Sequence, residues 1–316
     1  MEGRRPDAPL VSVVICTHNR ARQLRQALRS VAAQTLPRDA FETIVVDNAS
    51  TDETRTLAHE FRAAAHVHYL FESTRGLCHA RNAGWRAARG QYVAYLDDDA
   101  EATPGWLVEI LRAFESVRPT PGCVGGRVDP VYEAPRPAWL SDDIAVSLTI
   151  VDWSETPHVI QDLRREWLVG ANLACRRAAL EDVGGFHPAL DRSGNNLLSS
   201  GDVYLQRLIM EAGHSCYYHP AAAVRHHVPA ARLERRWFVR RYYWQGVSDA
   251  MMEILHDRPT ASARRRAALR RALALLGSPT QLAALALPTA DPDRFTSKCW
   301  ALIALGHVMG LLRARP

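Results

Sequence analysis

Short apolar runs alternate with segments of helical periodicity along the first 130 residues. The runs lie at residues 10–16, 41–47, 67–71, 92–96 and 123–128. Between them, residues 21–34, 51–64, 77–89 and 104–117 carry apolar side chains at i, i+3 and i+4 spacing, which is typical of amphipathic helices. The first two runs are nearly continuous and β-branched, as in strands covered on both faces. The pattern predicts a βαβ series, hence an α/β fold with a mostly parallel sheet.

The pattern changes after residue 130. Proline, tryptophan and aspartate become frequent between residues 130 and 157, which predicts an irregular connection. Residues 167–175 predict a further strand, and residues 177–183 and 201–212 predict two helices. From residue 230 to the end the pattern is helical, with breaks near Pro259, Pro279 and Pro288.

The composition is that of an ordinary folded protein with a slight basic excess. The 316 residues are 47% hydrophobic and 23% charged, and the formal net charge is +5. That charge suits an anionic partner such as phosphate, nucleic acid or a lipid headgroup. The 6 cysteines form no CxxC pair, and the first ten residues lack the apolar run of a signal peptide. We therefore expect reduced thiols in a cytoplasmic protein.

Polar residues follow three of the predicted strands, at the sheet edge where open parallel sheets bind ligands. They are residues 17–20, residues 47–52 and the triplet Asp97, Asp98 and Asp99. Helix capping accounts for the first two groups but not for the triplet. Three adjacent carboxylates repel one another and are costly to desolvate unless a cation neutralises them. Oxygen ligands favour Mg²⁺ or Mn²⁺, and the alternative is a solvated acidic loop.

The sequence lacks the usual glycine cradles for a nucleotide. The first strand is followed by CTHNRAR, without the GxGxxG of a dinucleotide site, and no GxxxxGK[ST] loop occurs. A bound nucleotide would have to be held by side chains and a metal ion.

Several motifs occur in an order that resembles the family-2 glycosyltransferases, which have the nucleotide-sugar-binding GT-A fold. They are VSVVICTHNR, VVDNAST, GLCHARNAGWRAARG, YLDDD, GANLACRRAALEDVGGF, SSGDVYLQRLIMEAG and VRHH. The resemblance covers residues 10–246. It implies a tail at 1–9, a GT-A catalytic domain at 10–229 and a C-terminal helical region at 230–316. Within the domain, residues 10–129 would form a Rossmann-like nucleotide-binding half and residues 130–229 the acceptor-binding half.

The resemblance also implies an activity. It is the inverting, divalent-metal-dependent transfer of a sugar from a UDP- or dTDP-sugar to an acceptor hydroxyl or amine. The acceptor could be a glycan, a glycolipid or a secondary metabolite, and Mn²⁺ or Mg²⁺ would be the cofactor. A nucleic-acid partner is not expected.

Site residues carry over from the matching motifs. The donor-binding side chains would be Thr17, Asn19, Arg20, Asp47, Arg81, Asp97 and Asp98. Asp47 would accept the imide proton of the base, and Asn82 would lie beside Arg81. The metal ligands would be Asp99 and a histidine, either His226, which has the better motif position, or His227. Asp202 would be the catalytic base. The acidic residue that precedes this base in the family, and that would normally help to bind the acceptor, is replaced here by Gly201.

Other functions remain open from the sequence. One is a nucleotidyltransferase of related fold, although its glycine-rich basic signature is absent. Another is a non-catalytic protein that binds polyanions or membrane surfaces. The C-terminal helices are rich in arginine, and residues 299–312 form a fourteen-residue apolar run, too short to span a bilayer. These helices predict either peripheral contact with the inner membrane face or a homodimer.

Overall fold

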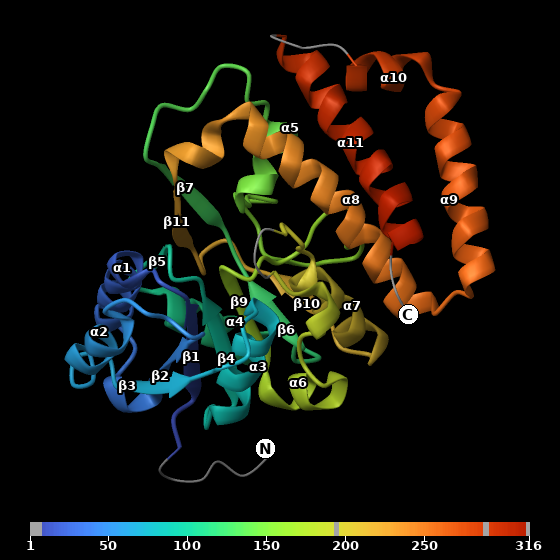
Figure 1. Ribbon diagram of the computed structural model, residues 1–316. Coiled ribbons are helices and arrows are strands. Elements are labelled where there is room, and N and C mark those ends of the chain that lie inside the picture. The colour runs from blue at the N-terminus through green and yellow to red at the C-terminus, as the bar shows by residue number, and fades with distance from the viewer. Residues whose placement is uncertain (1–7, 193–195, 287–290, 314–316) are drawn as a thin grey trace. The chain divides into compact units, whose positions relative to one another are not determined.

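The computed structural model describes residues 8–192, 196–286 and 291–313 (Figure 1). The chain forms two units. The α/β unit comprises Met1–Val131, Thr149–Pro188 and Gly201–His227, and the helical unit comprises Tyr132–Leu148, Ala189–Ser200 and Val228–Pro316. Most of the predicted N-terminal tail, and the predicted helix break at Pro288, lie outside the described residues.

An eight-stranded mixed sheet organises the α/β unit. Its strands, in spatial order, are β3 (Val67–Phe71), β2 (Phe41–Asp47), β1 (Val11–Thr17), β4 (Tyr92–Leu96), β9 (Asn172–Arg176), β6 (Cys123–Gly125), β10 (Cys216–Tyr218) and β8 (His158–Val159). The first four strands are parallel, whereas β9 runs antiparallel to both β4 and β6. The predicted α/β fold is confirmed.

Helices flank this sheet. They are α1 (Ala21–Ala32), α2 (Thr54–Glu60), α3 (Leu77–Ala87), α4 (Trp106–Ser116), α6 (Arg177–Val183) and α7 (Gly201–Glu211). In α1 the buried side chains are Leu24, Ala27, Leu28 and Val31, which share one face of the helix because they lie three or four residues apart. The apolar positions that predicted this helix are therefore the ones that it buries in the core.

A second, three-stranded sheet was not predicted. It pairs β5 (Ala100–Ala102), β11 (Val224–Val228) and β7 (Val128–Tyr132), in that order. β11 runs antiparallel to β5 with His226 opposite Ala100. This sheet brings a late segment of the chain against the residues that directly follow the aspartate triplet.

Two predicted segments differ from the structure. The segment 130–157 is not wholly irregular, because it holds the end of β7 and the short helix α5 (Asp142–Ala145). The strand expected at 167–175 begins only at Asn172. The reason is that the backbone of Leu168 and Gly170 is bonded to side chains of α7 instead of to a neighbouring strand.

The helical unit contains α5 and four longer helices. These are α8 (Arg235–Asp257), α9 (Ala261–Leu276), α10 (Pro279–Ala286) and α11 (Pro292–Arg313). α8 and α11 touch backbone to backbone, since a Cβ atom at Gly306 would lie 2.0 Å from the Tyr243 carbonyl oxygen. Pro279 is the first residue of α10, a position where its missing N–H costs nothing.

The apolar run at 299–312 lies within the longer helix α11. Among the described helices, α11 alone is long and apolar enough to cross a membrane, judged by its 22 residues and mean hydropathy of 1.4. Core helices of soluble proteins pass the same test, and 44% of its apolar window is buried. One such helix is weak evidence for membrane association.

Candidate functional site

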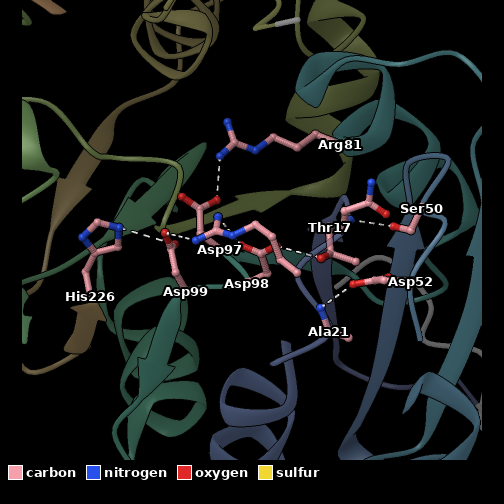
Figure 2. A network of polar contacts seen from close by, with 11 residues as sticks. Thr17, Ala21, Ser50, Asp52, Arg81, Asp97, Asp98, Asp99 and His226 are labelled. Carbon is pink, nitrogen blue, oxygen red and sulfur yellow. Dashed lines mark hydrogen bonds and ion pairs between the residues drawn. The ribbon is translucent and has the colours of Figure 1, made fainter. Parts of the chain in front are cut away.

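The loops after β1 and β2 are bonded into one rim. Asn19, with a φ of 52°, donates its backbone N–H to Ser50 Oγ at 3.0 Å and accepts from the Thr51 N–H at 2.6 Å. Asp52 accepts from the backbone N–H of Ala21 at 3.0 Å. These contacts, visible in part in Figure 2, fix the carboxyl ends of both strands relative to each other.

Asp47 ends β2 as a buried, oriented carboxylate. One oxygen accepts from the Ser50 N–H at 2.8 Å and the other from the Tyr69 hydroxyl at 2.7 Å. Burial and the Asp47 carboxylate raise the pKa of Tyr69 to about 12, so its hydroxyl stays protonated and donating. Tyr69 was not predicted, because a tyrosine in a half-buried edge strand carries no signal of its own.

Arg20 bridges two members of the aspartate triplet. Its guanidinium donates to Asp98 Oδ1 and to Asp99 Oδ2, each at 2.8 Å, and Thr17 Oγ1 donates to Asp98 Oδ2 at 2.7 Å (Figure 2). Burial raises the pKa of Asp98 to about 7; Arg20 acts in the opposite direction and Asp99 adds to the rise. The positive charge of Arg20 therefore offsets part of the repulsion expected among these carboxylates.

Arg81 forms an ion pair with Asp97, the remaining carboxylate of the triplet. Its Nη2 donates to Asp97 Oδ1 at 3.0 Å, and its guanidinium lies 5.2 Å from the centre of the Phe186 ring. Only 6% of Arg81 is exposed, and a Cβ at Gly170 would lie 2.1 Å from Nη2. Burial disfavours the charged guanidinium, but the Asp97 and Asp202 carboxylates raise its pKa above the ordinary value. Arg81 is thus a buried cation between two predicted site carboxylates.

The structure distinguishes the two candidate histidines. His226 Nε2 lies 3.4 Å from Asp99 Oδ1, and only 2% of the residue is exposed. His227 points to the other face of β11, where its Nε2 lies 2.5 Å from Glu101 Oε1. Side chains of adjacent strand residues point to opposite faces of the sheet. Of the two histidines, only His226 can therefore bind the same metal ion as Asp99.

The donor set around Asp99 fits a divalent cation. Two ligands of one octahedral ion, each ~2.1 Å from it, would lie ~3 Å apart, close to the 3.4 Å seen here. The His226 Nδ1 is buried, and no protein group among the described residues forms a hydrogen bond with it. Within the described residues no third His, Cys, Asp or Glu joins the pair. The rest of a coordination shell would come from water and substrate oxygens. A mixed imidazole and carboxylate pair fits Mn²⁺ better than Mg²⁺.

Asp202 lies at the start of α7 with both oxygens oriented. Oδ2 accepts from the Gly170 N–H at 2.9 Å and Oδ1 from the Val203 N–H at 3.0 Å. One turn later, the buried Gln206 exchanges two hydrogen bonds of 2.8 Å with the backbone of Leu168 and donates to the Asp202 carbonyl at 2.9 Å. Gln206 was not predicted. The only sequence feature that marks it is that it is a polar residue four positions after Asp202.

Two asparagines near the site have structural roles. The Asn82 side chain forms hydrogen bonds with the backbone N–H and carbonyl of Phe186 and accepts from Trp85 Nε1. These contacts occupy the amide that was expected, beside Arg81, to face the donor. Asn172, the first residue of β9, accepts from Trp106 Nε1 and donates to the Ala222 carbonyl. Both side chains fasten segments that are distant in sequence.

The predicted residues therefore fall into three connected groups in the α/β unit. Thr17, Arg20, Asp98, Asp99 and His226 form one network (Figure 2). Arg81 links Asp97 to the neighbourhood of Asp202. Asn19 and Asp47 belong to the rim at the ends of β1 and β2. Such an arrangement can bind an anionic, metal-linked group and place a carboxylate base beside it.

Comparison with known proteins places these groups in a family. The chain is 27% identical over 256 residues to the glucosyl-dolichyl phosphate glucuronosyltransferase of Haloferax volcanii, covering 80% of this chain and 79% of that protein. The mannosyltransferase PcManGT of Pyrobaculum calidifontis, solved with GDP-mannose and Mn²⁺, superposes with a TM-score of 0.62 at 24% identity, over 96% of this chain and 87% of that one. TarS of S. aureus, solved with UDP-GlcNAc, gives a TM-score of 0.56 at 18% identity, over 96% of this chain and 81% of that one.

The family itself is identified by the α/β unit. The model of glycosyl transferase family 2 matches residues 12–184, more than half of the chain and most of the strands that carry the site. The solved relatives show the same GT-A fold. The chain belongs to glycosyl transferase family 2 and is a glycosyltransferase of the GT-A fold.

Proposed function

We propose that this glycosyltransferase is an inverting, metal-dependent enzyme that uses a UDP- or dTDP-sugar. The observation that carries the proposal is the Asp99 and His226 pair, which lies beside the Arg20-bridged carboxylates and is buried. A bound divalent cation would offset the charge that develops on the departing nucleoside diphosphate. The complex of PcManGT with GDP-mannose and Mn²⁺ supports such a site in this fold.

The nucleoside would be read at the rim formed by Asn19 and Asp47. Asp47 already accepts two hydrogen bonds, and a carboxylate has about four acceptor positions, so capacity for a base N–H remains. A buried acceptor discriminates against bases that leave it unpaired. Uracil and thymine each present an imide N–H. Guanine also presents an N–H, and PcManGT was solved with GDP-mannose, so GDP is the informative competitor.

Thr17 and Arg20 would line the nucleoside pocket near the diphosphate, and Arg81 would face the diphosphate or the nucleoside. Asp97 and Asp98 would contact the ribose and the donor sugar. The Arg20 side chain is 31% exposed, and its forked donors suit phosphate oxygens. Asp202 would take the proton of the acceptor as it attacks the anomeric carbon, in a single displacement. Its two backbone N–H contacts hold the carboxylate in place.

Residues 10–129 would serve the nucleotide and residues 130–229 the acceptor. A glycan, a glycolipid and a secondary metabolite all fit the chemistry of Asp202. The name of the Haloferax relative refers to a lipid-linked sugar, which supports a lipid-linked acceptor for this chain. A cytoplasmic location is part of the same proposal.

Calorimetric titration with nucleotides tests the donor and metal assignments together. UDP or dTDP is expected to bind at least ~10-fold more tightly with Mn²⁺ than with a chelator, because the diphosphate needs a counter-charge. GDP is expected to bind more weakly under both conditions. Equal affinity with and without Mn²⁺ would contradict the metal site, and tighter binding of GDP would reassign the base read by Asp47.

A pair of adjacent variants tests the histidine. His226→Ala is expected to raise the Mn²⁺ concentration for half-maximal activity by ~10-fold or more, since it removes one of two protein ligands. His227→Ala is the matched control, because this ring contacts Glu101 on the other face of the strand. The measurement is activity against Mn²⁺ concentration for both variants. The assignment is wrong if His227→Ala shows the larger shift.

A further inference from the structure

Helix α9 of the helical unit exposes an apolar stripe bordered by arginines. Leu269, Leu273 and Leu276 are 60%, 58% and 63% exposed. They lie four and three residues apart, which at 3.6 residues per turn places them within an arc of about 60°. Single exposed leucines are common on protein surfaces, but three in one stripe on one helix are not explained by the fold.

Three arginines border this stripe. Arg265, Arg266 and Arg270 are exposed, and no ion pair is seen for them within the described part of the chain. The helix ASARRRAALRRALALL contains no acidic residue at all. The outer face of α9 therefore combines apolar side chains with positive charge that no neighbour on the helix neutralises.

The opposite face of α9 holds the helix in place. Ala268 and Leu275 are buried, and Ala268 packs with Ala250 and Leu311 in a small core. Arg271 reaches Glu253 on α8 at 3.1 Å. Thr260 caps the first turn by accepting from the Ala263 N–H at 3.2 Å. The outer stripe thus sits on a helix that is already formed, so a partner need not fold it.

We propose that the outer face of α9, defined by Leu269, Leu273, Leu276, Arg265, Arg266 and Arg270, docks on an anionic lipid surface. Leucine side chains enter the boundary between headgroups and acyl chains while arginines contact lipid phosphates. The apolar and the basic side chains of this face would then both contact the lipid. The inference goes beyond the proposed function, since it concerns a helix outside the α/β unit and does not depend on the donor or the metal.

A second copy of the chain fits this face poorly. In a twofold contact through α9, the arginines of one helix would meet those of the other, with no acidic residue of either helix to pair with them. Like charges brought together in an interface cost free energy. An anionic surface supplies the opposite charge.

Vesicle flotation of the full-length protein tests the proposal. Binding is expected to phosphatidylcholine vesicles that contain about 30% phosphatidylserine, and to fall as salt screens the arginines. Pure phosphatidylcholine vesicles should bind at least ~10-fold less. Replacing the three leucines by alanine, or Arg265, Arg266 and Arg270 by glutamine, should each lower the partition coefficient by ~10-fold or more.

A matched charge control separates docking from general electrostatics. Arg62, Arg86 and Arg118 are exposed on the α/β unit, and replacing them by glutamine removes the same charge. This control should float like the wild type, and all variants should keep the wild-type melting temperature. Absence of binding at low salt overturns the proposal. So does equal loss in the control, or a concentration-dependent dimer that the leucine variant abolishes without lipid binding.

Discussion

Asp99→Ala is expected to abolish sugar transfer and the effect of Mn²⁺ on nucleotide binding while the protein stays folded. Asp99 offers Oδ1 toward His226 and bonds Arg20 through Oδ2, so its loss leaves His226 as the one remaining protein ligand of the proposed metal site within the described residues. Charge stabilisation by a bound metal ion is worth several kcal/mol, which corresponds to a rate loss of at least ~10³-fold. Asp98 still pairs with Arg20, so the half-buried arginine keeps a carboxylate partner.

Turnover at saturating donor, nucleotide titration with and without Mn²⁺, and a melting curve measure these expectations. Glu101→Gln is the matched control. It removes a carboxylate two residues away that pairs with Arg225 and His227 on the other face, and its turnover should stay close to that of the wild type. Near wild-type transfer by Asp99→Ala in added Mn²⁺ would show that the metal is held elsewhere.

Asp202→Asn is expected to lower kcat by roughly a hundredfold or more with little change in donor affinity. The amide cannot take the acceptor proton, whereas the donor contacts lie on other residues. Two backbone N–H groups point at the carboxylate, so the NH₂ of asparagine must face one of them, at a cost of ~1–3 kcal/mol in stability. Single-turnover kinetics, donor binding and a melting curve separate these effects.

Gln206→Ala separates the base from its support. This variant frees the Leu168 backbone and the first turn of α7 but keeps the Asp202 carboxylate. If Asp202 is the base, its asparagine variant should lose far more turnover than Gln206→Ala at a similar loss of stability. A drop in donor affinity at unchanged kcat would move Asp202 into the donor pocket, and unfolding alone would leave it as a helix cap.

The parallel half of the fold could be predicted because its signals are local. β1, β2, β3 and β4 are compact apolar runs, and each is followed by its own amphipathic helix or polar turn. β5 and β11 are short and partly polar, and neither has a pattern that stands out. They become strands through pairing within the three-stranded sheet, β5 with β11 and β11 with β7. Such pairing depends on contacts between distant residues, which periodicity does not reveal.

The site residues also differ in whether a local sequence signal could predict them. The rule that ligands bind at strand ends selected Thr17, Asp47 and the aspartate triplet from the sequence, whereas Asp202 and His226 came from the family resemblance. Tyr69 and Gln206 were missed because each acts through hydrogen bonds to neighbouring residues of the site rather than through a motif. The choice between His226 and His227 required the register of β11, since one residue of slip reverses the face.

The pairing of β11 with β5 also sets an order of events during synthesis. β5 leaves the ribosome long before β11, so the nascent chain can form the Arg20 contacts with Asp98 and Asp99 while the histidine is still unmade. A fragment that ends before Val224 keeps the arginine and the carboxylates but lacks His226. Translation therefore supplies the carboxylates and the arginine of this cluster first and the histidine that faces Asp99 after them.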